Sequence, residues 1–224
     1  MIRSLLLATS LFVAPLAALA APPANVGDAI MAASAYHDSG DYQRDFDAVV
    51  AQARQWIKQT APKTRHPAIV LDIDETTLSN WDEIRADDFG YIPAGPCDAL
   101  PKGPCGVIAW EKSGRAPAFA SMRALIEEAQ ANHVAVFFVT GRHEDERDAT
   151  ERNLHLAGIQ HWDGLYLRPM TSHGYAALYK APTRERIERK GYTIIASLGD
   201  QPSDLSGGFA EKTFLLPNPF YRIP

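Results

Sequence analysis

The sequence is constrained most by a series of short, uninterrupted apolar runs, each too short to form a helix alone. Continuous apolar runs of this length are typical of strands that are buried on both faces. Segments with apolar residues at helical spacing precede and separate these runs; in 41–60, before the first run, Phe46, Val50 and Ile57 share one face. Strands that alternate with helices form βαβ units, so we predict an α/β fold with a mostly parallel sheet and flanking helices. The predicted strands are 68–71, 134–139, 164–167, 193–198 and 213–216, and the other helices are 117–131, 144–157 and 182–190.

Residues 79–116, which follow the first predicted strand, interrupt this alternation. The segment contains four prolines and both cysteines of the chain. Because long irregular segments inside a compact domain are commonly functional, we predict a small cap insertion over the functional edge of the sheet. A long structural loop without substrate contact is the alternative. The aromatic residues of the segment are Trp81, Phe89, Tyr91 and Trp110.

The cysteines, Cys97 and Cys105, flank a loop that is rich in proline and glycine. In an exported protein the favoured interpretation is a disulfide. A zinc site is less favoured because no further cysteine or nearby histidine completes it. A catalytic thiol and two free thiols are the remaining alternatives.

The N-terminal segment has the features of a secretory signal peptide. Arg3 precedes an apolar run over 5–19, and an Ala-x-Ala cleavage pattern ends at Ala20. The run is short for a membrane span, so a membrane anchor is the weaker alternative. We therefore predict a signal peptide over 1–20 and a single domain over 21–224. This domain would be periplasmic or secreted, without a membrane anchor after cleavage.

The charge of the chain argues against one class of partner. The formal net charge is −5, and no basic cluster is present. This pattern is not that of a protein that binds nucleic acid polymers. It does not exclude a small anionic substrate, because local charge and a bound metal determine whether such a molecule binds.

Polar residues directly follow three of the predicted strands. In an open parallel sheet, ligands bind outside the carboxyl ends of the strands, so these side chains should meet in space. Carboxylates that gather in this way repel one another unless a cation offsets their charge. Mg²⁺ prefers oxygen ligands, so we predict a magnesium site here. The residues are Asp72 and Asp74, Thr140 and Gly141, and Asp200 and Asp204.

Each polar residue at the strand ends has a predicted role. Asp72 is the candidate nucleophile, because a carboxylate can attack phosphorus and form an aspartyl-phosphate. Asp74 would bind the metal through its backbone carbonyl, which leaves its side chain free for proton transfer. Lys180 is the candidate cation for the transferring phosphoryl group, and Thr140 and Gly141 are candidates for binding its oxygens. The predicted metal ligands are Asp72, Asp74 and Asp200, with Asp204 supporting them indirectly.

The ordered set of motifs resembles that of the haloacid dehalogenase-like phosphohydrolases. The longer stretches 71–80 and 179–201 are similar to class C (subfamily IIIB) bacterial acid phosphatases and to related plant acid phosphatases and vegetative storage proteins. The resemblance covers about residues 41 to 219. The four motifs are Asp72-x-Asp74-x-Thr76, Thr140, Lys180 and Gly199-Asp200-x-x-x-Asp204.

The resemblance implies a Rossmann-like fold with a modest cap, a Mg²⁺ cofactor and acid phosphatase activity on small phosphomonoesters. Because aromatic faces stack on planar groups, the aromatic residues of 79–116 favour aryl phosphates or nucleoside monophosphates as substrates. The resemblance also implies that Asp72 is the nucleophile and Asp74 the general acid and base. The chain departs from the family at two points. It lacks the cysteine to which many class C members attach lipid, and Ala181 follows Lys180 where serine is expected.

Other functions fit the sequence less well. A non-catalytic storage or phosphate-binding protein on the same fold is the main alternative, and the intact set of motif residues argues against it. A carbon–halogen hydrolase would need neither the second aspartate of the first motif nor a metal. Arg142 either orients the substrate or pairs with an acidic neighbour. The sequence indicates a small phosphomonoester as the partner molecule and carries no signal for an oligomeric state.

Overall fold

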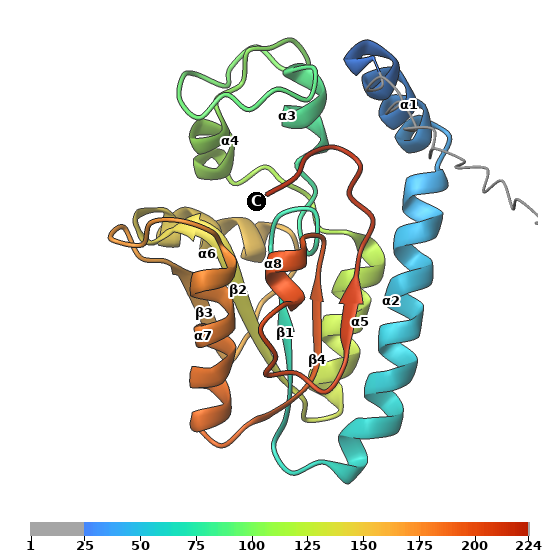
Figure 1. Cartoon of the computed structure of the whole chain (residues 1–224), viewed down its shortest axis with the longest axis vertical. Helices are drawn as coiled ribbons and strands as arrows, with labels where there is room; N and C mark the ends of the chain where they lie inside the picture. Colours follow the sequence, from blue (N-terminus) through green and yellow to red (C-terminus); the bar gives the residue numbers. More distant parts are fainter. Residues whose placement is uncertain (1–24, 224) are drawn as a thin grey trace, which may run out of the picture.

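The computed structural model describes residues 25–223, and the predicted signal peptide over 1–20 lies outside them. Five parallel strands form one sheet in the order β3-β2-β1-β4-β5, which Figure 1 shows at the centre of the molecule. The α/β fold with a mostly parallel sheet is therefore confirmed. The strands are β1 (Pro67–Leu71), β2 (Ala135–His143), β3 (Gly164–Arg168), β4 (Thr193–Gly199) and β5 (Thr213–Leu215).

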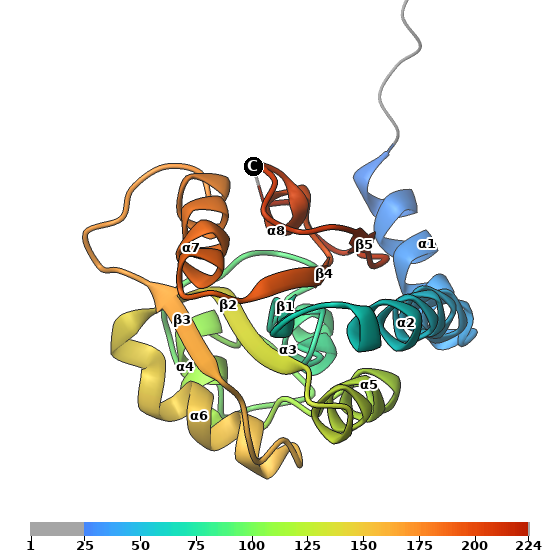
Figure 2. The same cartoon turned by 90° about the horizontal axis from the view of Figure 1, so that it is seen from below.

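Helices cover both faces of the sheet, with α2 and α5 on one face and α7 on the other (Figure 2). Side chains of β1 alternate between two cores. Ile69 and Leu71 join the larger core under α2 and α5, whereas Ala68 and Val70 join a smaller core with Ile187 of α7. Among residues 25–223, no helix is both long and apolar enough to cross a membrane. The helices are α1 (Val26–Asp38), α2 (Asp41–Thr60), η1 (Ala61–Lys63), α3 (Trp81–Ala86), α4 (Val107–Ser113), α5 (Ala120–Ala131), η2 (Glu144–Glu146), α6 (Arg147–Leu156), α7 (Ala177–Arg189) and α8 (Pro202–Leu205).

The start of α7 differs from the prediction. The predicted helix began at Pro182, but α7 begins at Ala177 and contains Pro182 in its second turn. Proline has no N–H, so the carbonyl of Leu178 loses its partner within the helix, and the helix tolerates this loss near its N-terminus. Lys180 consequently lies on a helix, where its backbone N–H donates to the carbonyl of Ala176 at 2.9 Å. The helix fixes the direction of its side chain.

Residues 79–116 leave the sheet after β1 and rejoin the body of the protein before α5. Their helices, α3 and α4, lie above the carboxyl ends of the strands in Figure 1. Cys97 and Cys105 form a disulfide in this segment, and Arg115 Nη2 donates to the carbonyl of Cys97 at 3.0 Å. The limits of this segment as a separate cap stay a prediction.

Candidate active site

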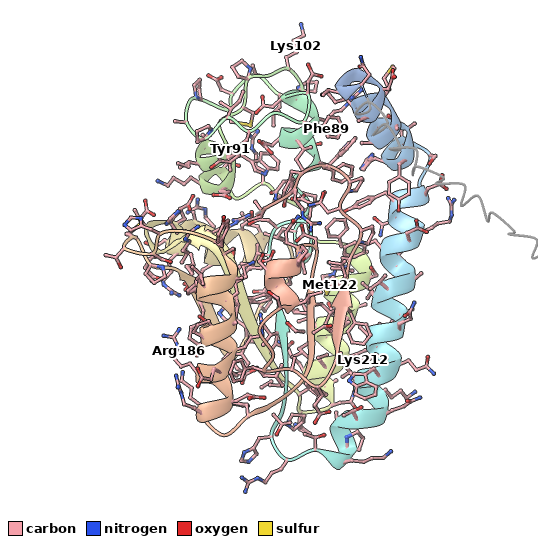
Figure 3. All side chains as sticks on the ribbon, in the orientation of Figure 1. Phe89, Tyr91, Lys102, Met122, Arg186 and Lys212 are labelled. Carbon is pink, nitrogen blue, oxygen red and sulfur yellow. A yellow bond between two sulfur atoms is a disulfide. The ribbon has the colours of Figure 1, made fainter. Side chains whose placement is uncertain are left out.

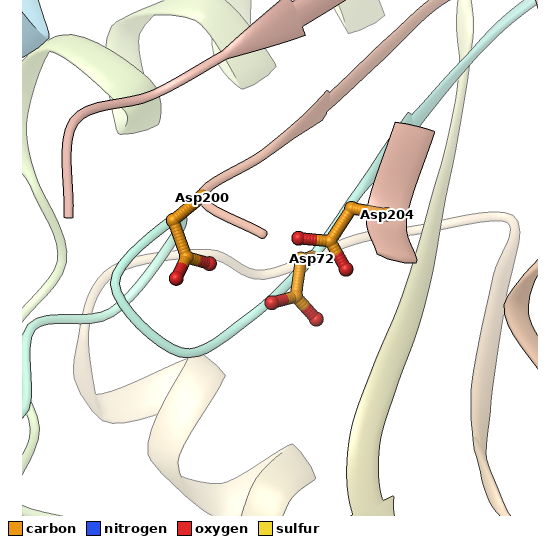
Figure 4. Close-up of side chains that lie close together, drawn as sticks. All are labelled: Asp72, Asp200 and Asp204. Carbon is orange, nitrogen blue, oxygen red and sulfur yellow. The ribbon is translucent and has the colours of Figure 1, made fainter. Parts of the chain in front are cut away.

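Three of the predicted aspartates meet at the carboxyl end of the sheet. Asp72 follows β1, Asp200 follows β4, and Asp204 lies on α8 (Figure 4). Each offers a carboxylate oxygen, and these oxygens all lie within 4.8 Å of one another. The three residues are only 6%, 5% and 3% exposed, respectively, so water screens their charges little. We call this group the aspartate cluster.

The position of Asp204 is fixed by its own turn and by close packing. The backbone N–H of Gln201 donates to Asp204 Oδ2 at 2.9 Å, and Arg184 Nη1 donates to the carbonyl of Asp204 at 2.6 Å. A Cβ atom at position 199 would lie 2.2 Å from the Cβ of Asp204. The glycine of the Gly-Asp-x-x-x-Asp motif, Gly199, is therefore required for the aspartate to approach the strand end.

Lys180 lies between two members of the aspartate cluster. Its Nζ donates to Asp72 Oδ1 at 2.8 Å and to Asp204 Oδ1 at 2.5 Å. Burial lowers the pKa of this ammonium group, but the two carboxylates outweigh burial and raise the pKa above its usual value. One ammonium offsets only part of the negative charge of the cluster. Burial and the charge of Asp204 therefore raise the pKa of Asp72 well above its usual value, and that of Asp200 to about 6.

Asp74 lies beside the cluster and is held by Arg142. Arg142 donates to Asp74 Oδ1 from Nε at 3.1 Å and from Nη2 at 2.7 Å. Asn80 Nδ2 donates to the same oxygen at 3.0 Å. Burial raises the pKa of Asp74, but the charge and hydrogen bonds of Arg142 outweigh burial and hold it below its usual value. Of the two roles left open for Arg142, the structure shows the pairing with an acidic neighbour.

Thr140 and Gly141 lie on the last part of β2, at the same edge of the sheet. Thr140 is fully buried, and its Oγ1 accepts a hydrogen bond from the backbone N–H of Arg142 at 3.1 Å, which leaves the hydroxyl proton free to be donated. A Cβ atom on Gly141 would meet nothing within 4 Å, so its backbone borders open space. Thr76 Oγ1 donates to Asp200 Oδ1 at 3.1 Å and so links the first motif to the fourth.

The C-terminal segment, residues 217–223, contributes to the site in a way that the sequence analysis missed. Asn218 Nδ2 donates to Asp200 Oδ2 at 2.7 Å, and Tyr221 OH donates to Glu75 Oε2 at 2.7 Å. Burial raises the pKa of Glu75 to about 8, with the charge of Asp74 adding to the effect. Figure 1 shows this segment passing above the strand ends. Its polar residues stand in a proline-containing tail with no motif spacing to mark them.

A cavity of about 370 Å³ opens beside these residues. Asp72, Asp74 and Lys180 line it from the strand ends and α7, and α3, α4 and the C-terminal segment line it from the cap side. A volume of this size is in the range of small-molecule sites. Asp72, Asp74, Gly141 and Lys180 thus border a space that can admit a small substrate.

Comparisons with known proteins show the family of the chain. Residues 16–224 match the family model of the HAD superfamily, subfamily IIIB (acid phosphatase). The chain is 32% identical over 185 residues to acid phosphatase 1 of Solanum lycopersicum. The aligned region covers 81% of this chain and 69% of that protein. It is 27% identical over 188 residues to vegetative storage protein 1 of Arabidopsis thaliana. The aligned region covers 83% of this chain and 67% of that protein. Its fold is similar to that of the class C acid phosphatase from Bacillus anthracis, with a TM-score of 0.71, 20% identity, and coverage of 88% of this chain and 86% of that one.

The chain therefore belongs to the subfamily IIIB acid phosphatases of the HAD superfamily, as the order of its motifs predicted. It is an enzyme of the phosphomonoesterase class. The likeness to the bacterial class C enzyme extends the agreement to the arrangement of the strands and helices.

Proposed function

We propose that the chain hydrolyses small phosphomonoesters in a Mg²⁺-dependent reaction through an aspartyl-phosphate on Asp72. The observation that supports this most is the buried aspartate cluster, with its oxygens within 4.8 Å of one another and Lys180 as its only lysine partner in the described chain. Carboxylate oxygens are the ligands that Mg²⁺ takes, and the negative charge left over fits a divalent cation. Asp72, Asp200 and the backbone carbonyl of Asp74 would hold the ion. When bound, it would offset negative charge on the phosphoryl group.

In the first step, Asp72 attacks the phosphorus atom. Its Oδ1 accepts the hydrogen bond from Lys180, which leaves Oδ2 as the attacking atom. A bond forms between Oδ2 and phosphorus while the bond from phosphorus to the leaving oxygen breaks. Lys180 offsets part of the charge, and the hydroxyl of Thr140 and the N–H of Gly141 bind phosphoryl oxygens.

Asp74 carries the proton in both steps. The ion pair with Arg142 favours the carboxylate of Asp74 in the free site, so Asp74 must first take up a proton, which it then gives to the leaving oxygen. As a carboxylate it then takes a proton from water, whose oxygen attacks phosphorus and breaks the bond to Asp72. Orthophosphate leaves, and both aspartates return to their starting states. Arg142 and Asn80 hold the Asp74 carboxyl group in position between these steps.

Transfer of labelled phosphate tests this mechanism. Acid quench of the wild-type protein with Mg²⁺ and labelled substrate should give a phosphoenzyme with the label on Asp72. Asp72→Asn should give no label, and its turnover should fall to background. A chelator should abolish turnover and Mg²⁺ should restore it. Label on another residue, or full turnover after removal of all metal, would contradict the proposal.

A storage role is the second candidate, because one of the relatives is named a vegetative storage protein. The complete set of motif residues, gathered at one edge of the sheet, supports catalysis instead. Background turnover across a panel of phosphomonoesters, in folded protein with Mg²⁺, would favour storage.

We also propose that residues 1–20 direct export and are then removed, leaving a single domain over 21–224 in the periplasm or the medium. A disulfide between Cys97 and Cys105 suits such an oxidising compartment. The intact mass of the exported protein should correspond to a chain that begins at Ala21 and is two hydrogens lighter than the reduced form. An uncleaved N-terminus or two alkylatable thiols after denaturation would contradict this.

A further inference from the structure

One wall of the active-site cavity carries charge that the proposed reaction does not use. Glu83 of α3, Glu111 of α4 and Glu146 of η2 all line the cavity. They lie on the cap helices and just after β2, and none of them belongs to the motifs that hold the phosphoryl group. We call these three residues the acidic wall.

Glu83 is the member of the acidic wall that most lacks a partner. The residue is 5% exposed, and among residues 25–223 its carboxylate has no hydrogen bond or ion pair, while its oxygens open onto the cavity and are not among the fully enclosed atoms. Buried carboxylates are normally paired, because burial without a partner is unfavourable. Burial, followed by the charges of Asp87 and Asp74, accordingly raises the pKa of Glu83 to about 7. Its carboxylate borders the cavity without a cation beside it.

The nearby arginine does not balance the other two glutamates. Arg142 Nε lies 3.8 Å from Glu111 Oε1, but Nε and Nη2 already donate to Asp74. Glu146 Oε2 accepts a hydrogen bond from the backbone N–H of His143 at 2.9 Å, whereas its Oε1 is buried without a partner in the described part of the chain. Arg142 therefore already pairs with Asp74, and among residues 25–223 the second arginine that lines the cavity, Arg168, forms no ion pair with any member of the acidic wall.

Aromatic side chains complete this end of the cavity. Phe89, Tyr91 and Trp110 line it together with the acidic wall, and Figure 3 shows Phe89 and Tyr91 in the segment above the sheet. The glutamates do not converge on a point, because within residues 25–223 only the aspartate cluster brings three ligand atoms within 4.8 Å of one another. Carboxylates and aromatic rings around a volume suit an organic cation better than a metal ion, since an ammonium group is attracted to both.

We propose that the acidic wall, with Phe89 and Tyr91, is a leaving-group subsite selective for phosphomonoesters of alcohols that carry an ammonium group. This inference rests on the proposed phosphatase function. The phosphate of such an ester faces Asp72 and Lys180, and the ammonium group faces Glu83. A second negative charge on the leaving group is repelled by the same wall.

A series of esters that differ only in charge tests the subsite. Phosphocholine carries a cation, 3,3-dimethylbutyl phosphate is its neutral isostere, and 3-carboxypropyl phosphate carries an anion. At a pH above 7, where Glu83 is ionised, we expect kcat/KM for phosphocholine to exceed that for the isostere about tenfold, with the anionic ester slowest. Salt should reduce the advantage of the cation.

Two variants separate the acidic wall from general charge effects. Glu83→Gln keeps the shape of the side chain and should bring the ratio of kcat/KM for phosphocholine and its isostere close to one. Asp82→Asn makes the same change of charge on the exposed side of α3 and should keep the wild-type ratio. Equal loss of the ratio in both variants would contradict a specific role for Glu83.

The wild-type protein alone can overturn the inference, so it does not depend on whether the variants fold. Equal kcat/KM for phosphocholine and its isostere, with normal Mg²⁺-dependent turnover of p-nitrophenyl phosphate, overturns the subsite and leaves the proposed function standing. No turnover of any ester overturns both. Tetramethylammonium should also inhibit hydrolysis of the neutral isostere competitively, and absence of inhibition counts against the subsite.

Discussion

Lys180→Met should lower the free energy of unfolding by about 3–5 kcal/mol at neutral pH, the typical effect of removing one partner from a buried ion pair. Methionine has a similar length but lacks the ammonium group that bonds to Asp72 at 2.8 Å and to Asp204 at 2.5 Å. The side chains of these aspartates are 7% and 3% exposed, so water cannot replace the lost cation. Because two carboxylates lose their partner at once, we expect the upper half of that range.

Urea denaturation with a chelator present measures this loss directly. The deficit of the variant should shrink as the pH falls, because the pKa of Asp72 is raised and its protonation removes part of the charge that Lys180 offsets. Under the magnesium proposal, Mg²⁺ at about 100 times its Kd should restore roughly 2.7 kcal/mol, since it binds only the folded chain. Lys58→Met, on an exposed face of α2, is the matched control and should change stability by less than about 0.5 kcal/mol. A loss for Lys180→Met as small as that of the control would refute the reasoning.

Three further predictions concern Asp74, Asn218 and Glu83. Asp74→Asn should still hydrolyse p-nitrophenyl phosphate, because that leaving group needs little protonation. The variant should hydrolyse alkyl phosphates about 10²–10⁴-fold more slowly than the wild type. Equal losses for both ester types in steady-state assays would exclude Asp74 as the proton donor. Asn218→Ala should weaken Mg²⁺ binding about tenfold in calorimetry, because Asp200 loses a hydrogen bond of 2.7 Å, and an unchanged Kd would contradict this. The pKa of Glu83 is raised from 4.5 to about 7, so the stability that its protonated form contributes is present below pH 4.5 and is lost as the pH rises through 7. Glu83→Gln should flatten this part of the stability–pH profile, and an unchanged profile would contradict the assignment.

The strands and the longest helix could be predicted from the sequence because their patterns reflect burial directly. The apolar runs located all five strands, since a parallel sheet with helices on both faces buries most residues of its central strands. The predicted helix 41–60 coincides with α2, whose apolar face is long enough to be unambiguous. β2 continues past its predicted end at 139 to His143, because polar residues at the edge of the sheet keep the extended backbone without the apolar pattern.

The aspartate cluster could be anticipated because strand ends of a parallel sheet share one edge, whatever their separation in sequence. The hydrogen bond from Tyr221 to Glu75 spans 146 residues and involves a tail without a regular element, so no local spacing predicts it. The ion pair between Arg142 and Asp74 left no signal beyond two charged residues near strand ends. For Glu83, the sequence shows one acidic residue among many in the cap segment, and only the packing shows that it is buried without a partner.

The charge balance of the site is a physical argument against a storage role. Without a cation, the raised pKa values of Asp72, Glu75 and Asp200 mean that the folded chain disfavours their ionised forms. A carboxyl pKa that is raised by folding reduces stability as the pH rises through it. Replacement of buried ionic groups by apolar residues of similar size is often neutral or stabilising, so a protein that only stored amino acids would gain stability from such replacements. Under the proposed mechanism, a divalent cation would offset this penalty on binding, Asp72 and Asp200 would hold the ion, and Asp72 would attack the phosphoryl group. The proposed catalysis would account for this unfavourable charge, which has no use in storage.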